Sequence, residues 1–316
     1  MINMPIHLPL SATKNVNSVT LPTITTPRMM NNTNLISSAL LIVAGLTLTS
    51  GCKKMVHQNI QAASNSSIAI IAFNDAFEQL NAAVSSELAL DQMTQANWNL
   101  SGTLCATVTL APLGAAFPKT LTIDYGNGCI GPDGVTRTGK IVATFSGNFR
   151  EEGTAINLIF DGYLTGQYAL AGSDSITNNG TNGSGDPQFS EVLRDVVISW
   201  GTQQILWEAD LNRTWTDGSE TNFTTDTVGG TLNMAGLRDD VFELTGSASG
   251  NDANTHPFSL EIATPLVLQT GCGFIQQGTL TVSPANFDDG AVDYGTGECD
   301  RQATVEVNGE VFNFTL

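Results

Sequence analysis

The sequence predicts a mainly β protein, an antiparallel β-sandwich or open barrel with one N-terminal amphipathic helix. Apolar and polar residues alternate with a period of two along many segments after Asn97, as strands with one buried face do. Gly-rich breaks recur between these segments, and no helix separates them as a parallel sheet would require. Charged residues make up only 13% of the 316 residues, so Thr, Asn, Ser, Gln and Gly must cover most of the surface. Such a composition is typical of β-rich domains with many turns.

The first element is an apolar run that ends at a cysteine. Residues 39–46 have the size of the apolar region of a secretory signal, well short of the roughly 20 residues of a spanning helix. Residues 50–51, Ser-Gly, precede Cys52 as small residues precede the acylated cysteine in the lipobox of bacterial lipoproteins. Thr49 stands where the lipobox usually has leucine, so an ordinary signal peptide or a buried apolar strand is the alternative. We expect residues 1–51 to be removed and Cys52 to be lipidated.

The charge of the chain limits its partners. Twelve Lys and Arg face 30 Asp and Glu, a net charge of −18, and removal of residues 1–51 would leave the excess of acids larger still. Phosphate binding rests on Lys and Arg, so we expect no nucleic-acid partner and a membrane partner only through the N-terminal lipid anchor. The charge favours solubility outside the cell, or cationic partners.

Two segments are expected between the cysteine and the sheet. Residues 52–67 are predicted to be the lipidated cysteine and a polar tether. Residues 68–95 predict an amphipathic helix, because apolar residues recur there at spacings of three and four without Gly or Pro. We expect the apolar face to cover the β core or its open end, with a partner-binding helix as the alternative. The stripe consists of Phe73, Phe77, Leu80, Val84 and Leu88.

Residues 96–316 are predicted to form the antiparallel β domain. Alternation is clear along residues 141–145 and along residues 207–215, where one face is apolar except for Arg213. At the C-terminus, the Asn-Gly pair at 308–309 predicts a two-residue type I′ turn, because both central residues need positive φ. The register that follows pairs Val307 with Glu310, Val305 with Phe312 and Ala303 with Phe314.

An internal repeat relates residues 107–129 to residues 279–299. Each copy has a strand, a proline-ended loop and an Asp-Tyr-Gly-x-Gly turn before a cysteine. Two copies are too few for a solenoid, so we expect related pieces at the two ends of one β domain or the cores of two adjacent ones. If Cys52 carries lipid, an even number of cysteines is left, as suits an oxidising compartment. The repeat favours the two local disulfides among the three possible pairings: Cys105 with Cys129, and Cys272 with Cys299.

These motifs resemble those of uncharacterised envelope lipoproteins of Bacteroidetes-type bacteria. The resemblance rests on the lipobox followed by Lys-Lys and on the strand and turn motifs at residues 124–141 and 293–309. It implies a lipid anchor in the outer membrane and no known activity. Some such proteins reach the cell surface through acidic residues just after the lipidated cysteine, and residues 53–57 contain none. Whether the protein faces the periplasm or the cell surface is therefore left open.

Catalysis finds little support, and we expect a non-enzymatic binding or structural role without a cofactor. Only His57 and His256 follow Cys52, so a catalytic triad or a multi-His metal site would depend on an isolated histidine. No phosphate loop, nucleophile elbow or His-Glu-x-x-His motif is present. The alternative is a carboxylate-dependent hydrolase acting on glycans, which needs two acids facing one cleft roughly 5–10 Å apart. Adjacent acids occur at Glu151-Glu152, Asp239-Asp240 and Asp288-Asp289.

A carbohydrate site is one binding hypothesis, and a glycan or a protein of the envelope is the expected partner. Trp207 and Trp215 share one face of a predicted strand on either side of Arg213, and an exposed aromatic platform would stack on a sugar ring. The alternative is that both tryptophans are core residues. Arg213 favours the site, because a cation on an apolar face needs a partner or water.

Two further hypotheses concern small sites. Asp288, Asp289 and Asp293 offer oxygen ligands to calcium beside a turn, although the spacing of a calcium-binding loop is absent and exposed turn acids are the alternative. Ser175 and Thr227 each follow Asp and precede an apolar residue, the pattern that O-glycosylation uses in the bacteria that this chain resembles.

Overall fold

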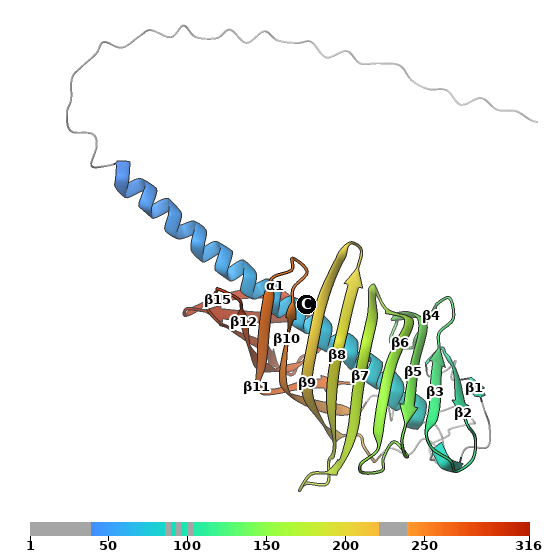
Figure 1. Ribbon diagram of the computed structural model, residues 1–316. Helices are drawn as coiled ribbons and strands as arrows, with labels where there is room; N and C mark the ends of the chain where they lie inside the picture. The colour runs from blue at the N-terminus through green and yellow to red at the C-terminus, as the bar shows by residue number, and fades with distance from the viewer. Residues whose placement is uncertain (1–38, 86–89, 93–96, 100–103, 221–238) are drawn as a thin grey trace, which may run out of the picture. The chain divides into compact units, whose positions relative to one another are not determined.

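The computed structural model describes residues 39–85, 90–92, 97–99, 104–220 and 239–316 (Figure 1). The chain divides into two compact units, Met1–Leu48 and Thr49–Leu316, and the second contains the whole sheet. The elements are α1 (Ala39–Ser85), the 3-10 helix η1 (Leu90–Gln92), β1 (Asn97–Asn99), β2 (Thr107–Ala111), β3 (Lys119–Asp124), β4 (Cys129–Ile130), β5 (Thr136–Phe145), β6 (Ala155–Thr165), β7 (Tyr168–Thr181), β8 (Pro187–Trp200), β9 (Gln203–Asp217), β10 (Val241–Asn251), β11 (Pro257–Gln269), β12 (Gln277–Pro284), β13 (Gly290–Thr296), β14 (Gln302–Val307) and β15 (Glu310–Thr315).

All fifteen strands belong to one antiparallel sheet whose order follows the chain from β1 to β15, with β4 paired to β5 beside the main path. Figure 1 shows the strands of this unit succeeding one another along α1. Within the described residues the edge strands β1 and β15 do not pair, so the sheet is open. Buried residues of α1 and of strands throughout the sheet form one core. The predicted antiparallel β fold with one N-terminal helix is confirmed, and α1 occupies the position that a second sheet would take in a sandwich.

Helix α1 differs from the prediction at both ends. It runs without a break through Cys52 and through residues 52–67, where the sequence predicts a tether. It ends at Ser85, earlier than the end predicted for the helix over residues 68–95. Asn59, Asn65 and Ser67 of the supposed tether bond to residues of the sheet or its turns, and such partners cannot be recognised from the sequence.

Two contacts show how residues 52–67 of α1 are held against the sheet. The Asn59 side-chain amide donates to the Asp288 backbone carbonyl at 3.1 Å, and the hydroxyls of Ser67 and Tyr294 lie 2.8 Å apart. Both helix residues are buried. A buried polar group must be hydrogen-bonded to avoid a large desolvation cost, so these contacts stabilise the helical register against the sheet.

The apolar stripe covers the β core as predicted. Phe73, Phe77, Leu80 and Val84 are all buried, while Leu88 lies outside the described residues. The ring of Phe77 meets two aromatic rings of the sheet edge-on, with centroid distances of 5.6 and 5.4 Å. Edge-to-face packing of this kind adds to the free energy gained by burial.

The strand predictions are also confirmed. Along β5, Ile141, Ala143 and Phe145 are buried and alternate with more exposed residues. In the C-terminal hairpin, β14 and β15 pair in the predicted register. Phe314 is buried, and Phe312 packs partly buried against the core.

The internal repeat corresponds to β2–β3 near one edge of the sheet and β12–β13 towards the other. In each copy the aspartate accepts a hydrogen bond of 2.8 Å from the backbone of the glycine two residues later. The tyrosine of each copy reaches α1: Tyr125 donates to Gln79 at 2.9 Å, and Tyr294 contacts Ser67. The repeated motif is therefore a turn that aims a buried tyrosine at the helix, and both copies belong to one unit.

Candidate functional site

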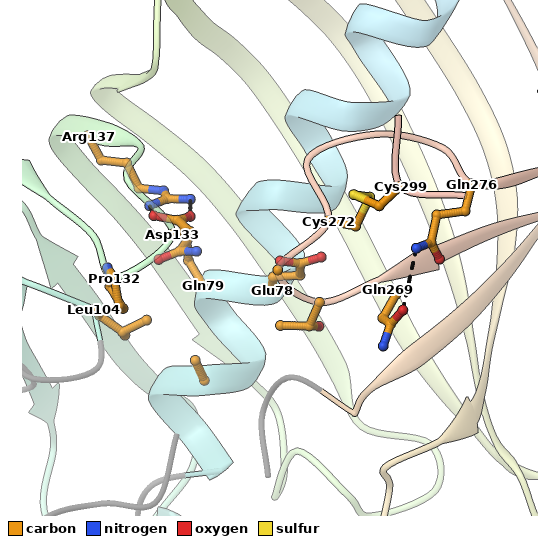
Figure 2. A pocket seen from close by; sticks show the side chains of 13 residues that line it. Glu78, Gln79, Leu104, Pro132, Asp133, Arg137, Gln269, Cys272, Gln276 and Cys299 are labelled. Carbon is orange, nitrogen blue, oxygen red and sulfur yellow. Dashed lines mark hydrogen bonds and ion pairs between the residues drawn. A yellow bond between two sulfur atoms is a disulfide. The ribbon is translucent and has the colours of Figure 1, made fainter. Parts of the chain in front are cut away.

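A cavity of about 470 Å³ lies between α1, the turn that joins β4 to β5, and the loop that follows β11 (Figure 2). A smaller hollow of about 240 Å³ shares four of its wall residues, among them Glu78. Figure 2 shows Glu78 on α1 between the Asp133–Arg137 pair on one side and the loop with Cys272 and Gln276 on the other. The larger cavity is lined by Glu78, Gln79, Ala82, Leu104, Pro132, Asp133, Arg137, Gln269, Thr270, Gly271, Cys272, Gln276 and Cys299.

Two disulfides hold the walls of this cavity. Cys272 and Cys299 are joined with their Cα atoms 5.8 Å apart, and both line the cavity. Cys105 and Cys129 are joined with their Cα atoms 5.9 Å apart, next to the lining residue Leu104. The predicted local pairings are confirmed, and they explain how two loops without regular structure keep a fixed position over the helix.

Arg137 forms a charged cluster at one side of the cavity. Its guanidinium is almost fully buried and binds the carboxylates of Asp75 on α1 and Asp133 on the β4–β5 turn, with Nη2 2.5 Å from an Asp133 oxygen. The Tyr163 hydroxyl donates to Asp75 at 2.7 Å. Partial burial alone would raise the pKa of Asp133, but hydrogen bonding and attraction to Arg137 lower the pKa below its ordinary value. Asp133 is therefore ionised and paired with Arg137 at neutral pH.

Glu78 is the acid of the site that forms no ion pair with the described residues. Its Oε1 accepts a hydrogen bond of 2.7 Å from the Asn74 side chain, and it is in none of the ion pairs formed by the described residues. The carboxyl is partly accessible from the cavity but enclosed by protein. Burial, followed by repulsion from Asp75, raises the pKa of Glu78 to about 8. Glu78 is then mostly protonated at neutral pH and can donate a hydrogen bond into the cavity.

The two acids among the described lining residues, Glu78 and Asp133, do not have the arrangement of a glycosidase. A glycosidase needs a free carboxylate opposite its acid. Both oxygens of Asp133 bond to Arg137, and one also accepts from the Val135 backbone at 3.0 Å. None of the adjacent acid pairs found in the sequence lines this cavity. The six acids of those pairs are Glu151, Glu152, Asp239, Asp288 and Asp289, which are exposed, and Asp240, which is buried.

The predicted carbohydrate platform is wrong. Trp207, Arg213 and Trp215 are each no more than 2% exposed and face the core. Arg213 pairs there with Glu191 of β8, and its Nη1 donates to the Asn74 side chain at 2.6 Å. The sequence was correct that Arg213 needs a partner, but the curvature of the sheet around α1 turns the apolar face inward, and Glu191 supplies the charge.

The calcium hypothesis also fails for the described residues, which contain no cluster of three metal-binding side chains. Asp293 caps the Gly295 backbone, as Asp124 caps its glycine in the other repeat. Asp288 accepts a hydrogen bond of 2.9 Å from Asn308, and Asp289 is exposed. Asp288 and Asp293 therefore stabilise turns.

The modification sites are placed as follows. Ser175 is exposed on β7, within a strand rather than a loop, and its hydroxyl lies 3.3 Å from the Asn157 side chain. Thr227 lies outside the described residues. Cys52 lies within α1, and its side chain is not among those described. No helix of the described part of the chain is long and apolar enough to cross a membrane.

Sequence reasoning missed the cavity residues. Asp75 and Glu78 lie between the apolar residues of the helix stripe. Acids are rarely buried without a partner, so their position was the one sequence signal of a site on this helix. Asp133 and Arg137 belong to a turn and strand start that carry no catalytic or binding motif. Comparison of the chain with protein-family models, with curated proteins and with solved structures finds no match.

Proposed function

We propose that this chain is a lipid-anchored lipoprotein of the bacterial outer membrane that binds a small organic cation in the cavity around Glu78. The anchor is supported by the apolar run that ends at Cys52 and by the resemblance to envelope lipoproteins. Binding is supported by one observation above all: a cavity of about 470 Å³ is lined by an acid that forms no ion pair with any described residue.

The charges around the cavity select the class of ligand. The single guanidinium in its walls already pairs with two aspartates, so an incoming anion would find no free cation among the described lining residues. An ammonium or guanidinium group, in contrast, would replace the proton of Glu78 and form an ion pair. Leu104, Pro132 and Ala82 offer an apolar wall for the rest of the ligand.

A matched set of probes tests the ligand class. Tyramine, tyrosol and 4-hydroxyphenylacetate share one ring and differ in carrying a cationic, a neutral and an anionic group. Isothermal titration of the disulfide-bonded protein should show tyramine binding at least tenfold more tightly than the other two, about 1.4 kcal/mol. Equal affinities, or no binding of tyramine at millimolar concentration, would contradict the proposal.

The role of Glu78 is tested with variants. At pH 7, tyramine binding should release close to one proton, measured by titration in buffers of different ionisation enthalpy, because Glu78 must ionise. Glu78→Gln should weaken binding at least tenfold and abolish proton release. Glu151→Gln, which removes an exposed acid outside the cavity, is the control and should change neither. An equal loss in the control variant would mean that overall charge, not Glu78, holds the amine.

The anchor is tested separately. Cys52→Ser should move the protein from the detergent phase to the aqueous phase in a phase-partitioning assay, because acyl chains on that cysteine supply the membrane affinity. Mass spectrometry of the N-terminal peptide of the unmodified protein should find an acylated Cys52. An unchanged partition, or a mature N-terminus at another residue, would contradict this part of the proposal.

A further inference from the structure

We infer that α1 holds the folded unit directly on the bilayer, with the turns at 285–289 and 308–309 facing the lipid and the cavity held away from it. This inference rests on the proposed lipidation of Cys52. The partner surface is the bilayer that carries the acyl chains of this same cysteine. The arrangement follows from the absence of slack between Cys52 and the sheet, from the contacts at the start of α1, and from the length of helix between anchor and cavity.

The first step is the absence of a tether. Cys52 is part of α1, and the helix continues from it into the sheet-bound segment without a break. Lys54, two residues later, places its ammonium 5.8 Å from the centre of the Phe287 ring. Met55 contacts the Asn308 side chain through its sulfur at 3.8 Å. Since a helix rises about 1.5 Å per residue, the first contacts with the sheet lie within roughly 5 Å of the anchor along the helix axis.

The second step identifies the surface beside the anchor. The turn between β12 and β13 and the turn between β14 and β15 meet beside residues 54–59 of α1. There the Asn308 side chain donates to an Asp288 carboxylate oxygen at 2.9 Å. Asn59 binds the Asp288 carbonyl, and a Cβ on Gly290 would lie only 2.5 Å from the Asn59 oxygen. The helix and the two turns are therefore packed as one body. Val311, 61% exposed just after the second turn, adds an apolar side chain at this end.

The third step concerns the cavity. About 26 residues separate Cys52 from Glu78 on the same helix, which corresponds to roughly 39 Å along its axis. The helix is bound to the sheet along this length by Ser67 with Tyr294 and by Gln79 with Tyr125. The helix therefore cannot pivot separately from the sheet. If the two turns contact the bilayer, the cavity at the far end of the helix lies in the aqueous compartment. The ligand must then arrive from water and not from the acyl chains of the bilayer.

Fluorescence quenching on vesicles tests this orientation. The full processed protein is reconstituted into phosphatidylcholine vesicles that contain lipid with a spin label on the headgroup. A fluorophore is attached in turn through Ala285→Cys, beside the anchor, and through Thr136→Cys, near the cavity; both native residues are exposed. We expect at least fivefold stronger quenching at position 285 than at position 136. Similar quenching at both positions would overturn the inference.

A linker variant separates rigid attachment from other causes. Ten Gly and Ser residues inserted between Lys53 and Lys54 give the unit slack, so quenching at position 285 should fall towards the value at position 136. Unchanged quenching would overturn the spacer role of α1. Mass spectrometry of the same sample reports acylation of Cys52: an unacylated cysteine contradicts the proposed anchor, whereas an acylated protein with the wrong quenching pattern contradicts only the orientation.

Discussion

Two arginines of the described residues are buried, and each binds acidic partners in different surroundings. Arg213 and Glu191 are each 1% exposed at their side chains, and the guanidinium lies 4.2 Å from the centre of the Phe77 ring. Arg137 is equally buried, but its partners Asp75 and Asp133 are 14% and 29% exposed. The comparison shows that an arginine–carboxylate ion pair is enclosed in the core in one place and lines an accessible cavity in another.

Each cluster also holds one acid beyond those that its arginine binds. Asp174, near Arg213, has its pKa raised well above the ordinary value by burial and by Glu191. Glu78 lines the cavity with Arg137 and Asp133, and its partner Asn74 also binds Arg213; burial, followed by repulsion from Asp75, raises the pKa of Glu78 to about 8. Asp174 is fully enclosed, whereas Glu78 lines a cavity. Access to solvent and ligand, not the kind of residue, therefore distinguishes a structural acid from a candidate binding acid.

Breaking the enclosed pair should have the largest effect. Arg213→Met leaves Glu191 without its cation inside the core, and removal of one partner of a buried ion pair costs about 3–5 kcal/mol. Urea unfolding should report this loss. Arg194→Met, which removes an exposed arginine from Asp210, is the control and should cost at most about 1 kcal/mol. The double variant with Glu191→Met should recover part of the loss, and no recovery would show that packing and not charge dominates.

Replacing Arg137 by methionine should lower the free energy of unfolding less than Arg213→Met does. Arg137→Met leaves Asp75 with its Tyr163 hydrogen bond and Asp133 with access to water, so we expect a loss of about 1–3 kcal/mol in urea unfolding. The affinity for tyramine should rise, because a cation is removed from the cavity wall. A loss as large as that of Arg213→Met would mean that the two clusters are energetically alike.

The pH dependence of stability tests Glu78. Its pKa is about 8 in the folded protein and near 4.5 in the unfolded chain, so its contribution is fully present below pH 4.5 and is lost as pH rises towards 8. The melting temperature of the native protein should fall between pH 5 and pH 8.5 by at least about 3 °C more than that of Glu78→Gln. A smaller fall should persist in the variant, because burial, followed by repulsion from Asp239, raises the pKa of Asp240 to about 8 as well. Parallel curves would contradict the assignment.

The smallest effect is expected at the enclosed acid. Burial, followed by repulsion from Glu191, raises the pKa of Asp174 well above its ordinary value, so the neutral, isosteric Asp174→Asn should change stability at pH 7 by less than about 1 kcal/mol. Tyramine affinity should not change, since Asp174 does not line the cavity. If Asp174→Asn weakened tyramine binding as much as Glu78→Gln, the distinction between enclosed and accessible acids would fail.

The sequence by itself determined the features that depend on neighbours along the chain. Period-two alternation predicts strands because successive side chains point to opposite faces, and β9 and the second half of β5, Ile141–Phe145, follow it. The Asn-Gly pair at 308–309 set the hairpin register because turn geometry and pairing are local. The local disulfides followed from the repeat for the same reason.

The tertiary structure alone decided what depends on distant residues. Whether the face with Trp207 and Arg213 is core or surface depends on the curvature of a sheet around α1, which alternation does not encode. Asn59 and Ser67, in the segment predicted to be a tether, are helical and buried because residues more than 200 positions away, Asp288 and Tyr294, supply hydrogen bonds. Glu78 meets Asp133 and Cys272 only when the helix, a turn and a disulfide-held loop converge. Burial and electrostatic fields arise from such convergence, so the pKa and the binding role of Glu78 cannot be predicted from its sequence neighbours.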